Sequence, residues 1–76
     1  MSPRLPRVTA TEFVRALQRD GWFYVRQHGS DQFFAHSTKP GLVVVPAHRG
    51  KTLGLGLLKK LLDDAGLTVE ELERLL

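Results

Sequence analysis

The short turns between three strand-like segments restrict the fold of this chain more than any other feature of its sequence. Aromatic and β-branched residues dominate residues 22–27, 32–36 and 42–45, and such residues favour strands. Only short stretches, 28–30 and 37–41, clearly separate these segments. A parallel crossover needs about a dozen residues or more, so these turns predict an antiparallel three-stranded sheet. Aromatic residues occupy both odd and even positions of the first segment. The alternation of side chains along the strand therefore does not show which face is buried.

Helices are predicted on either side of the strand segments. Thr9 and Glu12 are spaced as in a capping box, and an apolar stripe with helical spacing follows them. We expect this helix to span residues 10–20, with Gly21 after its end. A second stripe ends at Gly66 and is expected to lie in the core. Its residues are Leu57, Leu58, Leu61, Leu62 and Ala65.

A short third helix is predicted at the C-terminal end. Thr68 and Glu71 repeat the spacing of a capping box, and leucines follow them. The expected order is α-β-β-β-α plus a short helix, which is an α+β fold in a single domain over residues 1–76. Residues 1–8 are expected to form a flexible arm before the first helix.

Size and composition exclude several classes of function. A chain of 76 residues buries about 60% of its unfolded surface, which leaves little material for a deep cleft or a large cofactor. Cysteine is absent, so disulfides and thiolate metal sites are excluded, and a reducing cytosol fits the composition. No apolar run approaches the ~18 residues of a membrane span, and no export signal is visible. We expect a cytoplasmic protein with no small-molecule cofactor and no membrane association.

The distribution of charge favours a polyanionic partner. The net charge is +3, but residues 1–51 carry +5 and residues 52–76 carry −2. All three histidines lie in the basic part. A basic region interleaved with histidine suits nucleic acid, because cations that contact phosphates dominate the affinity of such complexes. A solvated surface with a chance excess of cations explains the same numbers, and both interpretations stay open.

Two basic segments are the best candidates for contacts with phosphate. Residues 26–30 surround the first turn, and residues 46–51 follow the third strand segment. Each segment offers cations and hydrogen-bond donors. In a meander the two segments could lie at opposite ends of the sheet, so the sequence leaves their proximity open. With one lysine of the second turn, the candidate contacts with RNA or DNA are Arg26, His28, Gly29, Ser30, Lys39, His48, Arg49 and Lys51.

Other motifs give weaker signals. The three histidines have neither i, i+4 spacing nor a neighbouring cysteine, so we expect no metal site. The segment Gly54-Leu55-Gly56 lacks the third glycine and the Lys-Ser/Thr pair of a phosphate loop, and we interpret it as a loop and a helix start. Dimerisation through the leucine-rich C-terminal part, as in a structural adaptor, is a further hypothesis.

The order of several short motifs resembles the HicA family of toxin ribonucleases. These motifs are residues 21–30, Phe34-Ala35-His36, residues 45–53 and the stretch from Gly56 to Leu67. The resemblance extends over about residues 10 to 76. It implies a double-stranded-RNA-binding-domain-like fold, in agreement with the predicted order. It also implies metal-independent endoribonuclease activity on mRNA, growth arrest, and neutralisation by a HicB-type antitoxin encoded alongside.

One position departs from the family pattern. The resemblance implies a Gly-Ser-His triplet whose histidine acts in RNA cleavage, but Asp31 follows Gly29 and Ser30 here. Cleavage through the 2′-hydroxyl of RNA needs a group that accepts or donates a proton at neutral pH. Imidazole, with an ordinary pKa of about 6.5, does both, whereas a carboxyl group with an ordinary pKa of about 3.9 is a weak base and no acid at pH 7. We therefore expect an inactive or impaired ribonuclease.

The mismatch at Asp31 leaves several interpretations. Asp31 fits a natural degenerate copy or an engineered inactive variant, and we favour the variant, because lethal ribonucleases are handled in inactive form. The resemblance places a histidine at His36, which falls on the strand face opposite to Asp31 if the strand is regular. We expect His36 and His48 to be auxiliary RNA contacts. The alternative function is a non-catalytic module that binds RNA or the antitoxin.

Overall fold

The computed structural model of the protein describes residues 5–46 and 51–76. These residues form α1 (Ala10–Arg19), β1 (Trp22–His28), β2 (Asp31–His36), β3 (Val43–Pro46), α2 (Leu55–Ala65) and α3 (Val69–Leu75). The strands form an antiparallel sheet in the order β1-β2-β3. The expected α+β fold and its order of elements are therefore confirmed.

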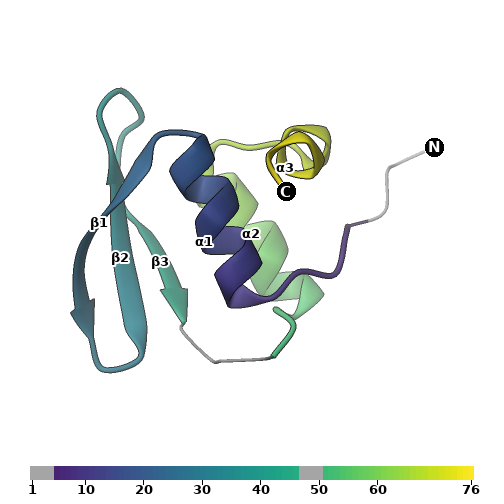
Figure 1. Cartoon of the computed structure of the whole chain (residues 1–76), viewed down its shortest axis with the longest axis horizontal. Coiled ribbons are helices and arrows are strands. Elements are labelled where there is room, and N and C mark those ends of the chain that lie inside the picture. The colour runs from purple at the N-terminus through teal and green to yellow at the C-terminus, as the bar shows by residue number, and fades with distance from the viewer. Residues whose placement is uncertain (1–4, 47–50) are drawn as a thin grey trace.

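The helices lie on one side of the sheet, as Figure 1 shows. α1 contacts β1 and β3, α2 contacts β3, and α3 packs on α1. No described helix covers the other face of the sheet. In the described part of the chain, none of the helices has the length and apolar character needed to cross a membrane. The fold is thus a two-layer sandwich with one open sheet face.

α1 begins at the predicted capping box. The Thr9 hydroxyl accepts a bond from the Glu12 amide at 3.2 Å, and the Glu12 carboxylate accepts one from the Thr9 amide at 2.9 Å. This backbone hydrogen bond lowers the pKa of Glu12, because it stabilises the carboxylate. The helix ends one residue earlier than predicted, at Arg19, because Asp20 is its C-cap. Gly21 then turns the chain toward β1 with a φ of +103°.

α3 begins at the second predicted capping box. The Thr68 hydroxyl accepts from the Glu71 amide at 3.1 Å, and the Glu71 carboxylate accepts from the Thr68 amide at 3.0 Å. The pKa of Glu71 is lowered, for the same reason as that of Glu12. Leu72 of this short helix is fully buried, and it anchors α3 in the core.

The core fills the space between the helices and the sheet. Its fully buried members include Phe13, Leu17, Phe34, Val43, Val45, Leu58 and Leu61. Val8 is also buried, and its carbonyl accepts a bond from the Leu53 amide at 2.8 Å. Val8 is therefore not part of the flexible arm expected over residues 1–8, and the prediction for residues 1–4 lies outside the described part. Leu57 is 36% exposed, so the leucine stripe is not all core; it is turned by about 100° from the buried Leu58.

The register of the sheet shows which strand faces are buried. Phe34 pairs with Val43, and both are buried against the helices. The neighbouring Phe33 and its partner Val44 therefore lie on the open face, because successive side chains point to opposite faces. A β-bulge leaves Val25 as the extra residue of β1 and pairs Arg26 with Phe33. This bulge shifts the alternation of β1, which simple parity cannot anticipate.

Candidate nucleic-acid interface

A two-residue turn joins β1 to β2. His28 pairs with Asp31 in the ladder, so only Gly29 and Ser30 form the turn. Gly29 has a φ of +61° and Ser30 has no positive φ, which is the pattern of a type II′ hairpin. The side-chain amide of Gln27 donates to the Gly29 carbonyl at 2.9 Å. The turn is thus tighter than the sequence predicted, and its backbone has a fixed conformation.

This turn places His28 and Asp31 side by side on the open face. The two are directly opposite in the ladder, where Cβ atoms lie about 4.5–5.5 Å apart. His28 is exposed and Asp31 is partly exposed. None of the ion pairs among the described residues joins them. From the sequence alone, His28 was expected across the turn from Asp31 as a phosphate contact and not as a replacement for the missing histidine. The Gly-Ser dipeptide, considered as a type II′ turn, is the signal that pairs it with Asp31.

The end of β3 lies beside the same turn. Pro46 pairs with Asp31, and Figure 1 shows the end of β3 at the edge of the sheet where the β1–β2 turn lies. The chain leaves the described part after Pro46 and re-enters it at Lys51, which is exposed. Lys51 adjoins Thr52, which forms a bridge with Thr9 at the start of α1. The second basic segment therefore starts next to the first, although the candidate contacts His48 and Arg49 lie outside the described residues.

The structure separates two other candidates from this turn. His36 is the last residue of β2, about 16 Å along the strand from Asp31. β2 pairs regularly with β3, so His36 lies on the face opposite to Asp31, as expected. Its ring packs edge-on against Trp22, with ring centres 5.1 Å apart. Lys39 lies farther along, in the turn that leads to β3.

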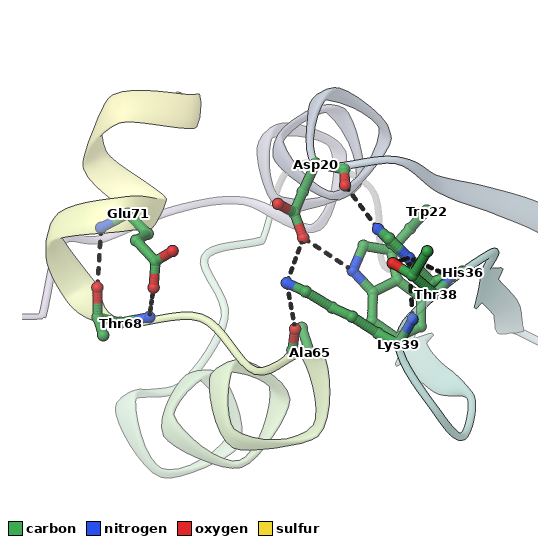
Figure 2. A network of polar contacts seen from close by, with 8 residues as sticks. All are labelled: Asp20, Trp22, His36, Thr38, Lys39, Ala65, Thr68 and Glu71. Carbon is green, nitrogen blue, oxygen red and sulfur yellow. Dashed lines mark hydrogen bonds and ion pairs between the residues drawn. The ribbon is translucent and has the colours of Figure 1, made fainter.

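Both ring nitrogens of His36 have partners within the fold (Figure 2). Its Nε2 lies 2.7 Å from the Asp20 carbonyl oxygen, which only accepts, so Nε2 carries the proton. Its Nδ1 accepts from the backbone amides of Thr38 at 3.1 Å and Lys39 at 3.2 Å. Through these bonds the imidazole ties the turn after β2 to the end of α1.

The Lys39 ammonium is held in the same network. Its Nζ lies 2.7 Å from the Asp20 carboxylate and donates to the Ala65 carbonyl at 3.1 Å. The Trp22 indole donates to the same carboxylate oxygen at 3.2 Å. These bonds join the ends of α1 and α2 to the sheet, as Figure 2 shows. The RNA contacts of His36 and Lys39 stay predictions, but both side chains have a structural function here.

The described residues hold no group of three or more His, Asp or Glu side chains that could bind a metal ion. The turn end instead offers a guanidinium at Arg26, an imidazole at His28 and a carboxylate at Asp31. A guanidinium and an imidazole can donate hydrogen bonds to an anionic group, and a carboxylate can accept them.

A comparison with known protein families shows which family this chain belongs to. Residues 10–67 match the family described as HicA toxin of bacterial toxin-antitoxin. The chain belongs to the HicA family. The match covers well over half of the sequence and includes the sheet, α1 and α2. No curated protein matches the chain. As a HicA member, the chain is the toxin of a toxin–antitoxin system, and the resemblance found in its sequence is confirmed.

Proposed function

We propose that this HicA toxin is a metal-independent endoribonuclease of the cytoplasm that binds mRNA at the β1–β2 turn. We further propose that a HicB-type antitoxin neutralises it and that Asp31 impairs its cleavage step. The observation that carries the proposal is the turn itself. Asp31 starts β2, is partly exposed, and has His28 as its cross-strand neighbour. The family resemblance leads us to expect a histidine at this position.

In the proposed reaction the RNA supplies its own nucleophile, the 2′-oxygen, and the protein assists two proton transfers. The 2′-oxygen of RNA loses its proton and attacks the adjacent phosphorus, and the bond from phosphorus to the 5′-oxygen breaks. The products are a 2′,3′-cyclic phosphate and a 5′-hydroxyl, which receives a proton. A carboxylate at Asp31 is a weak base, cannot donate at neutral pH, and repels the phosphate. Of the histidines in the described residues, His28 is the one at this end of the sheet.

Two exposed cations, Arg26 and Lys51, would hold the RNA backbone. Arg26 is exposed on β1, and Lys51 is exposed after the segment that follows β3. Both can contact phosphate without losing an intramolecular ion pair, since the ion pairs of the described residues involve neither. We place His36 and Lys39 outside this site, because their bonds hold α1 and α2 to the sheet.

The decisive experiment compares the parent chain with Asp31→His. We expect the variant to cleave labelled RNA about 10²- to 10⁴-fold faster, because it gains a positioned acid–base group. Cleavage should survive a chelator, and induction of the variant should arrest growth. Asp31→Asn is the matched control, since it removes the same negative charge but adds no proton-transfer group. His28→Ala in the parent chain should remove any slow cleavage that remains.

Two results would contradict this assignment. A folded Asp31→His protein that binds RNA but cuts no faster than its parent has no cleavage site at the turn. Equal gains from Asp31→Asn and Asp31→His would attribute the effect to charge repulsion. In the first case the alternative applies, a module that binds RNA or the antitoxin without catalysis, which Asp31 also favours. Co-expression with a HicB-type antitoxin should give a complex. Its association should slow as salt increases, because the basic part of the toxin attracts an acidic partner.

A further inference from the structure

The open face of the sheet carries exposed aromatic and cationic side chains. Phe23 is 52% exposed there, and Val25 of the bulge is 47% exposed. On the same face the Arg26 guanidinium lies over the Phe33 ring, 4.7 Å from its centre. The core does not need these rings, because Trp22 and other aromatic residues fill it from the opposite face. Their exposure therefore indicates that the open face binds another molecule.

We propose that this face is a stacking platform for the unpaired bases of single-stranded RNA. The ring of Phe23 and the guanidinium that covers Phe33 are its two surfaces. Aromatic rings and arginine planes bind any base through its π-face, so such a platform holds RNA with little sequence preference. This inference rests on the proposed function and deepens it, because it names the class of substrate that the turn end receives.

The platform is continuous with the turn. Phe23 pairs with Ala35 of β2, which lies four positions along that strand from Asp31. This spacing corresponds to about 13 Å, with Phe33 between the two points. An RNA whose reacting phosphate lies at Asp31 therefore extends its neighbouring bases over Phe33 and then over Phe23. In a duplex those bases are stacked and paired inside the helix, so the platform selects single strands.

The charge and shape of this face favour RNA over a protein partner. Arg26 is part of the platform and His28 borders it, and both belong to the basic part of the chain, residues 1–51 with a charge of +5. The bulge at Val25 interrupts the regular ladder of β1, which is an edge strand, and so hinders the addition of a strand from another chain. A protein interface over Phe33 would also have to desolvate the Arg26 guanidinium.

The test measures binding of a fluorescently labelled, unstructured oligonucleotide to the full chain. Phe23→Leu keeps an apolar side chain but removes the ring, and we expect about 5- to 150-fold weaker binding. The dependence of affinity on salt should keep its slope, because no phosphate contact is lost. Tyr24→Leu is the matched control, since Tyr24 is 50% exposed but stands beside Phe34 on the other face. Phe23→Trp should keep the affinity, and RNA should quench its emission.

Each other outcome overturns the platform, and the outcomes separate it from the proposed function. If Phe23→Leu binds RNA like the parent while Lys51→Ala weakens binding, the platform fails and the turn site stands. If the parent binds no RNA, both fail. If Phe23→Leu keeps RNA binding but loses the antitoxin or self-association, the face is a protein interface. Equal affinity of the parent for duplex and single strand also refutes the platform.

Discussion

We expect Gly21→Ala to destabilise this fold strongly. Gly21 joins α1 to β1 with a φ of +103°, which L side chains rarely adopt. A Cβ atom there would lie 2.8 Å from Nε2 of His36. That nitrogen is the one bonded to the Asp20 carbonyl at 2.7 Å. The added methyl group therefore strains the backbone and also displaces the imidazole from its partner.

The two effects can be given magnitudes. The unfavourable φ costs about 1–2 kcal/mol, and a lost hydrogen bond of this kind costs about 0.5–1.5 kcal/mol. We expect Gly21→Ala to lower the free energy of unfolding by about 1.5–3.5 kcal/mol. A domain of this size has about 4–11 kcal/mol in total, and each kcal/mol shifts its Tm by about 4–8 °C. The substitution should thus remove a large fraction of the stability.

Two other glycines of the chain are matched controls for this change. Gly29 has a φ of +61° but no atom within 4 Å of an added Cβ, so Gly29→Ala should show the backbone strain alone. Gly56 lies in α2 and also has open space, and Gly56→Ala should raise stability by about 0.5–1 kcal/mol. Urea unfolding followed by circular dichroism measures all three. The reasoning is refuted if Gly21→Ala destabilises the chain no more than Gly29→Ala.

Two further predictions concern charge. Lys39→Met should lower the free energy of unfolding by about 1 kcal/mol, because it breaks a partly exposed ion pair with Asp20, and should leave the salt dependence of RNA binding unchanged. Lys51→Ala should instead reduce the slope of log affinity against log salt by about 0.7 and leave stability unchanged. Urea unfolding and a salt titration measure the two effects, and the reverse pattern would contradict the assignment. The pKa values of Glu12 and Glu71 are lowered by the backbone bonds of their capping boxes, so the stability that they add is complete above the ordinary value of 4.5 and is lost as the pH falls below it. Thermal unfolding at several pH values should show this acid loss, and Glu12→Gln with Glu71→Gln, which keeps both acceptors, should reduce it; an unchanged acid limb would contradict the assignment.

The parts of the fold that depend on neighbours in sequence could be predicted. Both capping boxes involve residues three positions apart, and their geometry follows from residue types alone. The antiparallel sheet followed from turns too short for any other connection. The bulge at Val25 could not be predicted, because it depends on how β1 meets β2 rather than on its own alternation. The same holds for the exposure of Leu57, which depends on how α2 packs.

The candidate site was predictable only in part, for a similar reason. Asp31 was singled out through the family resemblance, and its residue type led to the prediction of impaired proton transfer, which stays a prediction. Counting cations cannot distinguish a free lysine from Lys39, whose partners Asp20 and Ala65 are distant in sequence. In the same way, the charge pattern included His36, but its bond to the Asp20 carbonyl requires the folded chain. Pairing across the turn, rather than sequence distance, brought His28 to Asp31.

The Asp20 network at one end of the sheet and the Gly29-Ser30 turn at the other have no side chain in common. Because of this separation, we expect a substitution at the turn to change function without destabilising the fold. Under the proposed function, a single codon change at position 31 would alter the cleavage step without breaking the bonds that hold the helices to the sheet. The changed chain would still fold, and we expect it to keep its binding to the proposed antitoxin.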